Sequence, residues 1–170
     1  MKVQIVHLED FDKASLYSAQ ILNDNLDIVG SEQYLEFLHE MKKVEKDRRQ
    51  LGELQKIIKR MVTLDGAEEN FFRRENSFRA LPPHWFTFFD SDGIEDFGLR
   101  LYCIRVNDEA LILLNGGRKT AQSVQNCPNC FPHFQFADKL TTAFYNAIYL
   151  NDIEVDGSQI KTDPNFYLEI

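Results

Sequence analysis

The chain has 170 residues, of which 44% are hydrophobic and 27% charged, and its formal net charge is −8. This length suits a domain with a substantial core, and a content of 14 Phe and 6 Tyr argues against intrinsic disorder. No apolar run approaches the ~18 residues that a membrane-spanning helix needs. The first residues, MKVQIVHLED, lack the pattern of a secretory signal peptide, so we expect a cytoplasmic protein with no membrane partner.

The acidic charge is concentrated at the two ends of the chain. Residues 1–30 contain 2 basic and 5 acidic side chains, and residues 138–170 contain 2 and 6, whereas residues 71–119 contain 7 of each. A strongly acidic protein cannot attract nucleic acid through its overall field. A nucleic-acid site would therefore need a local basic cluster, which only the middle of the chain could supply.

The first 65 residues predict strands followed by helices. Residues 2–8 alternate between apolar and polar side chains, as a half-buried strand does. Residues 15–22 fit either a second strand or a short helix. Residues 31–65 carry two apolar series with helical spacing, which predict a helical hairpin or one long bent helix. Ser31 is the expected N-cap, and Gly66 the expected stop signal.

The following segment changes to strand patterns. Residues 85–89 are apolar and aromatic enough for a strand, and a turn signal follows at residues 90–93. Residues 99–106 and 110–114 form the clearest predicted β-hairpin of the chain.

The C-terminal part predicts a helix and a short tail. Residues 136–150 return to helical spacing, and residues 153–168 fit one or two edge strands. The predicted class is α+β: N-terminal strand or strands, a helical hairpin, a small antiparallel sheet, a C-terminal helix and a short tail. We expect residues 1–170 to form a single domain, with residues 151–170 as an acidic C-terminal extension.

A basic corner follows the second strand of the hairpin. Gly116 and Gly117 allow a close approach of the backbone, and Arg118 and Lys119 present two cations beside it, which suits an anion site. The alternative is that these are solvated basic residues at a strand end. Arg100 and Arg105 are five positions apart, so a regular strand directs them to opposite faces.

These residues carry a family resemblance. Gly98-Leu99-Arg100-Leu101-Tyr102-Cys103-Ile104, then Ala110-Leu111-Ile112-Leu113-Leu114, then Gly117-Arg118-Lys119-Thr120 resemble the RelE/ParE toxin superfamily, which includes HigB-like and phage-related branches. That group has an arginine-bearing strand, an aliphatic strand and a glycine-basic-basic exit. The similarity covers about residues 31–145 in the order of elements and about residues 98–120 in sequence.

The resemblance implies a toxin-like component of a toxin–antitoxin pair, with a small antitoxin as its partner. Some members of the superfamily cleave messenger RNA on the ribosome. The resemblance to them implies an endoribonuclease that needs no cofactor and binds phosphate through a basic face. The implied catalytic residues are Arg100, Arg118, Lys119 and His133, and the implied binding residues are Arg79, Arg105 and Tyr145. The aromatic segment 85–89, the acidic charge and the length depart from that pattern, so a non-enzymatic protein-binding module on the same scaffold is the alternative.

Cys127, Cys130 and His133 form the other notable motif. They are three potential metal ligands within seven residues, but zinc needs a fourth and no second pair is present. A thioredoxin-like role would need the two cysteines to open a helix in a βαβ setting, and we expect them in a loop after the hairpin. A structural loop is therefore the default interpretation. His84, which follows two prolines, is also interpreted as a packed loop residue, with a place in the lining of a cleft as the alternative.

Overall fold

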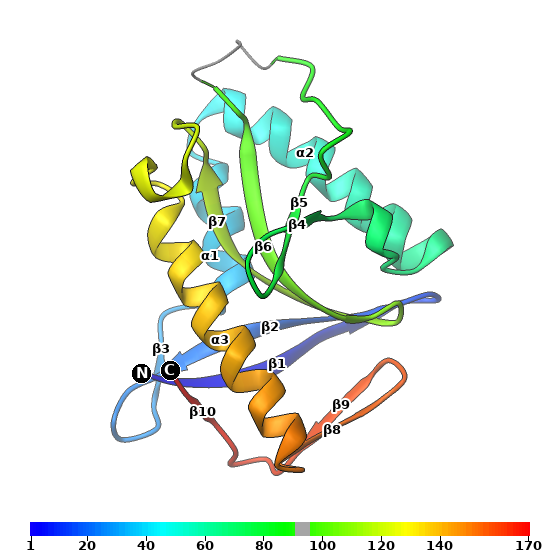
Figure 1. Cartoon of the computed structure of the whole chain (residues 1–170), viewed down its shortest axis with the longest axis vertical. Coiled ribbons are helices and arrows are strands. Elements are labelled where there is room, and N and C mark those ends of the chain that lie inside the picture. Colours follow the sequence, from blue (N-terminus) through cyan, green and yellow to red (C-terminus); the bar gives the residue numbers. More distant parts are fainter. Residues whose placement is uncertain (91–95) are drawn as a thin grey trace.

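The computed structural model describes residues 1–90 and 96–170. Its main sheet has eight strands: β1 (Lys2–Asp10), β2 (Ser15–Leu22), β3 (Ile28–Val29), β4 (Arg73–Arg74), β5 (Arg79–Leu81), β6 (Leu99–Asn107), β7 (Ala110–Arg118) and β10 (Leu168–Glu169). The strand order is β10-β1-β2-β7-β6-β5-β4, and β3 also pairs with β2 (Figure 1). β2 and β7 are parallel, and the other paired strands are antiparallel.

Three α-helices accompany the sheet: α1 (Gln33–Met41), α2 (Glu45–Arg60) and α3 (Phe131–Tyr149). Residues 31–65 thus contain a helical pair, and a π-helical turn at Met61–Asp65 continues α2. Gly66, with φ +85°, ends that turn as predicted. The predicted Ser31 cap is wrong, because the side chain of Glu32 accepts the hydrogen bond from the Leu35 N–H. Residues 15–22 are a strand, and the predicted β6–β7 hairpin is confirmed. The α+β class is confirmed as well. The predicted small antiparallel sheet is wrong, because β2 pairs with β7 in parallel and so joins the N-terminal strands and the hairpin in one mixed sheet of eight strands.

The two faces of the central hairpin are covered by different helices. Leu99 and Leu101 of β6 pack with α1 and α2 on one face, whereas Tyr102 and Ile104 pack with α3 on the other (Figure 1). Because both faces are buried, β6 and β7 are apolar almost throughout instead of alternating.

The strand predicted at residues 85–89 is wrong. Residues 82–90 form a loop in which Trp85 is 67% and Phe89 98% exposed. Pro82 and Pro83 are the first residues of this loop. Prolines have no N–H to donate to a sheet ladder, so β5 ends at Leu81. Beyond Asp90, the turn signal at residues 90–93 lies outside the described residues.

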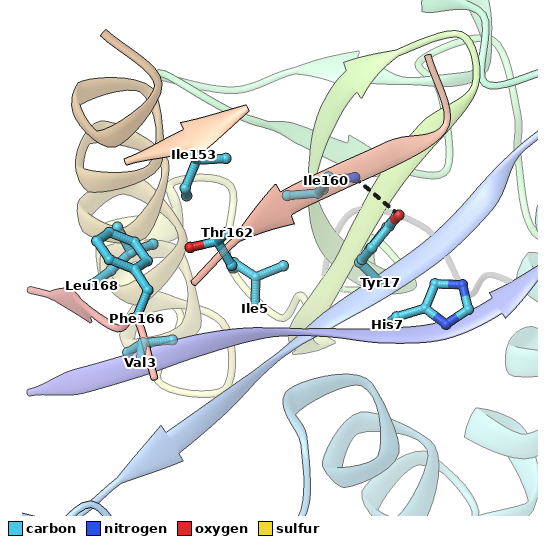
Figure 2. A pocket seen from close by; sticks show the side chains of 9 residues that line it. All are labelled: Val3, Ile5, His7, Tyr17, Ile153, Ile160, Thr162, Phe166 and Leu168. Carbon is cyan, nitrogen blue, oxygen red and sulfur yellow. Dashed lines mark hydrogen bonds between the residues drawn. The ribbon is translucent and has the colours of Figure 1, made fainter. Parts of the chain in front are cut away.

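The C-terminal tail returns to the sheet. Strands β8 (Ile153–Asp156) and β9 (Gln159–Thr162) form a separate two-stranded sheet, and β10 pairs with β1. Figure 2 shows the small cavity, of about 130 Å³, between this hairpin and the sheet. It is lined mainly by apolar side chains, and the Tyr17 hydroxyl there donates to the Ser158 carbonyl (2.8 Å) and accepts from the Ile160 N–H (3.2 Å). We interpret it as a packing seam.

Across residues 1–90 and 96–170, no helix combines the length and the apolar character required to span a membrane.

The backbones of β6 and β7 approach closely at Gly116. A Cβ atom there would lie 1.8 Å from the carbonyl oxygen of Arg100, whereas a Cβ at Gly52 in α2 would meet nothing within 4 Å. We expect Gly116→Ala to lower the free energy of unfolding by about 1–3 kcal/mol or more, because β6 and β7 must separate to make room for the added methyl group. Gly52→Ala is the matched control and should raise it by about 0.5–1 kcal/mol. Urea unfolding measures both, and an unchanged stability of Gly116→Ala would contradict the close approach.

Candidate anion-binding site

Arg100 is a buried cation in the middle of the fold. Its place in β6 puts it on the same face as Tyr102, and it is only 5% exposed. Its Nη1 donates hydrogen bonds to the backbone carbonyls of Phe97 (2.8 Å) and Leu99 (3.0 Å). These bonds orient the guanidinium but do not neutralise its charge.

Arg73 and Glu75 come from the edge of the sheet that β4 forms. They are two residues apart in the extended segment that begins with β4, so their side chains lie on the same side of the backbone. The Nε of Arg73 donates to the Pro82 carbonyl (2.8 Å), which ties this segment to the 82–90 loop. Both side chains are partly buried.

Lys119 is positioned by the end of β7. Its backbone exchanges hydrogen bonds with the neighbouring segment, the Lys119 N–H with the Gly98 carbonyl (2.9 Å) and its carbonyl with the Phe97 N–H (3.1 Å). Its ammonium lies 5.1 Å from the centre of the Phe97 ring, a cation–π contact.

The pKa shifts show that these groups lie close to one another. Burial, followed by repulsion from Arg73, lowers the pKa of Arg100 to about 10. The pKa of Lys119 is lowered mainly by burial and next by repulsion from Arg100. Burial also lowers the pKa of Arg73. Burial raises the pKa of Glu75 in spite of the opposing effects of all three cations and of His84. The charges of Arg73, Lys119 and Arg100 thus all act on the Glu75 carboxyl group.

A cavity of about 330 Å³ opens beside these cations. Its lining consists of Arg73, Pro82, Phe86, Thr87, Phe88, Asp96, Phe97 and Arg100. We call this cavity, together with the adjoining Lys119, Glu75 and His84, the cation pocket. His84 is exposed, in the loop that follows Pro83.

The cations of the pocket have no carboxylate partner in the described part of the chain. Other arginines do: Arg118 forms ion pairs with Asp47 (2.5 Å) and Asp96 (2.6 Å), and Arg79 pairs with Glu69 (2.9 Å). Leaving a buried cation without a counter-ion is costly unless an anion completes the site. The arrangement is therefore suited to a phosphate group.

The structure brings the four predicted catalytic residues together in two separate pairs, and Arg118 and His133 share a cavity of about 440 Å³ outside the cation pocket. Arg100 and Lys119 lie in the cation pocket, but Arg118 does not converge with Arg100 as expected. Arg118 is paired in register with Leu99, on the face that packs against α2, and its charge is taken up by Asp47 and Asp96. His133 lies in the first turn of α3, where burial lowers its pKa with no charged group of the cation pocket contributing.

The three predicted binding residues form a second group, away from the cation pocket. Arg79 and Arg105 both contact Glu69, and Arg105 also pairs with Asp108. The Tyr145 hydroxyl donates to the Arg105 carbonyl (3.3 Å). Arg105 faces the α1–α2 side, opposite to Arg100, as the five-residue spacing predicted. Two carboxylates balance two guanidiniums here, which leaves no excess positive charge.

The cysteine motif lies in the loop after the hairpin, as expected, at the point where this loop meets α3, and Cys130 is the N-cap of that helix. Cys127 and Cys130 are free thiols that are both buried. Burial raises the pKa of Cys130 to about 12, whereas hydrogen bonds from Thr120 outweigh burial and lower that of Cys127. Within residues 1–90 and 96–170, no three Cys, His or acidic side chains gather where they could hold a metal ion, so His133 does not complete a site with the thiols.

Sequence reasoning missed Arg73 and Glu75, whereas for His84 it kept a place in a cleft as the alternative to a packed loop. Arg73 and Glu75 had one available signal, an i, i+2 pair of opposite charge just before a strand. His84 was interpreted as a packed loop residue, yet it is exposed and close enough to Glu75 to influence its pKa.

Comparison of the chain with family models, with curated proteins and with solved structures finds no match.

The raised pKa of Glu75 has a consequence for stability. The folded state holds the Glu75 proton at pH values where the unfolded chain, with an ordinary pKa near 4.5, has released it. Stability that involves this group is therefore lost as the pH rises from about 4.5 through the folded-state pKa. We expect the free energy of unfolding of the wild type, relative to Glu75→Gln, to fall across that window and to level off above it. Urea unfolding at a series of pH values tests this, and a difference that rises with pH would contradict the shift.

Proposed function

We propose that the protein is a toxin-like component of a toxin–antitoxin pair and acts as an endoribonuclease at the cation pocket. The observation that carries this proposal is the gathering of Arg73, Arg100 and Lys119, without carboxylate ion pairs in the described residues, around Glu75 and close to His84. The order of elements also supports it: strands β1 to β3 precede the helical pair, and the hairpin β6–β7 and helix α3 follow later in the chain, which is the order that the resemblance to the RelE/ParE superfamily implies.

The pocket contains groups for each step of RNA cleavage. The Glu75 carboxylate accepts the proton of a ribose 2′-hydroxyl as its oxygen attacks the adjacent phosphorus. The 5′-oxygen leaves with a proton from the protonated His84 imidazole, which yields a 2′,3′-cyclic phosphate and a 5′-hydroxyl end. Arg73, Arg100 and Lys119 stabilise the charge that develops on the phosphoryl oxygens.

Cleavage of an RNA oligonucleotide by the purified chain tests the chemistry. We expect 2′,3′-cyclic phosphate products, and a rate reduced roughly 10²- to 10⁴-fold by Glu75→Gln, which removes the base, and roughly 10²-fold or more by Lys119→Gln. Mass spectrometry of the products and the initial rates provide the readout.

Two controls separate this site from the one that the sequence predicted. Lys139→Gln removes an exposed lysine of α3, and His133→Asn removes the acid–base candidate outside the pocket. Both variants should cleave at the wild-type rate. If His133→Asn abolishes cleavage while Glu75→Gln does not, the catalytic group is not in the cation pocket.

Growth of a bacterial host tests the toxin role separately. Induced expression of the wild type should arrest growth, and Glu75→Gln, expressed at the same level, should relieve the arrest because it lacks the base. A co-expressed antitoxin would be expected to act by covering the pocket. Unimpaired growth together with no RNA cleavage would refute the proposal and favour the non-enzymatic protein-binding module.

A further inference from the structure

A second hollow adjoins the cation pocket. It has a volume of about 340 Å³ and lies between α2 and the 82–90 loop. Phe86 lines both this hollow and the cation pocket, so the two cavities are neighbours. We call it the aromatic groove, and the lining residues that matter here are Lys56, Ile57, Arg60, Phe71, Trp85 and Phe86.

Trp85 is held in place although it is exposed. Its indole N–H donates to the Asn70 carbonyl (3.0 Å), and its ring meets Phe86 edge-on at 6.4 Å between ring centres. Phe86 in turn meets the buried Phe88 edge-on at 5.3 Å. The ring is thus anchored along one side while 67% of the residue's surface stays open to solvent. An oriented, exposed indole is a ready platform for another flat ring.

Cations border this platform. Lys56 is exposed, and no ion pair involves it in the described residues. Arg60 lies over the Phe71 ring at 6.0 Å and has a 65% exposed side chain, although its Nε also contacts Asp65. Glu53 is the carboxylate of the groove lining. Aromatic side chains flanked by basic ones are the combination that binds single-stranded nucleic acid: the bases stack, and the phosphates meet the cations.

Resting on the proposed function, we infer that the substrate is single-stranded RNA and that the base next to the phosphate in the cation pocket stacks on Trp85. The two cavities share Phe86, so a strand whose phosphate lies in the cation pocket has the aromatic groove as its immediate neighbour. A base paired within a duplex keeps its faces stacked on its neighbours and has none to offer to Trp85, which selects for single strands.

The chain has one tryptophan, so its fluorescence reports on this residue alone. We expect a single-stranded 2′-O-methyl RNA octamer, which cannot be cleaved through its 2′-oxygen, to quench that fluorescence. The same sequence in a duplex, and inorganic phosphate, should not quench it. Phosphate should nevertheless bind, as measured by calorimetry, because it needs only the cation pocket.

Substitution then separates stacking from phosphate binding. Trp85→Ala should weaken binding of a labelled octamer, followed by fluorescence anisotropy, roughly 5- to 100-fold and leave phosphate binding unchanged. Trp85→Phe should retain most of the affinity because it keeps an aromatic face. Tyr149→Ala, which removes an 85% exposed aromatic ring at the end of α3, is the matched control and should have no effect.

The outcomes distinguish the two claims. If the wild type cleaves RNA but Trp85→Ala binds the octamer as tightly as the wild type does, the stacking site is refuted and the endoribonuclease proposal stands. If neither phosphate nor the octamer binds the wild type, the cation pocket itself is refuted, and the inference that rests on it falls too. Equal quenching by single strand and duplex would overturn the selection for single strands.

Discussion

The burial of the central hairpin on both faces is the constraint on which the rest of the structure depends. Helices α1 and α2 cover one face of β6 and β7, and α3 covers the other, so most side chains of these strands are buried and their polar groups must be satisfied inside the protein. In the described residues two charged side chains are buried, Asp47 and Arg100. Asp47 has Arg118 as its partner, whereas Arg100 has two backbone carbonyls and no counter-ion.

That difference explains how an acidic protein can carry a positive site. Carboxylates take up the charge of the arginines that serve the fold: Asp47 and Asp96 on Arg118, and Glu69 and Asp108 on Arg105. The cation pocket keeps excess positive charge because Arg73, Arg100 and Lys119 form no ion pair in the described residues. Of the carboxyl groups there, Asp96 pairs with Arg118, and Glu75 is under the influence of all three cations. The net charge of −8 therefore describes the surface as a whole and says little about this cavity.

The 82–90 loop gives the pocket its surroundings. It begins at two prolines that end β5, contributes Phe86 and Phe88 to the cavity, and accepts a hydrogen bond from Arg73 through the Pro82 carbonyl. The same loop presents Trp85 to solvent beside α2. The prolines end β5, so the residues after them leave the sheet. Trp85 is therefore exposed at the proposed binding surface.

Local patterns in the sequence determined much of the fold. Helical spacing in residues 31–65 and the paired apolar runs around residues 99–114 specify elements through interactions of near neighbours, and these elements are present. The strand predicted for the aromatic run 85–89 is wrong because the prediction relied on composition, which is typical of a strand. The two prolines before this run end the strand at Leu81. The cap at Glu32 escaped prediction because a longer side chain supplied the acceptor that Ser31 was expected to supply.

The candidate site depended on contacts between distant segments. Arg100 and Lys119 were recognisable from the hairpin sequence, but nothing local indicates that Arg118 faces Asp47, 71 positions away, and is thereby neutralised. Arg73, Glu75 and His84 join the site because the β4–β5 edge folds against the start of β6. Composition and periodicity thus determined the class of fold and its central hairpin. Only the tertiary structure decided which cations keep their charge available, because ion pairing depends on distances in space and not on order along the chain.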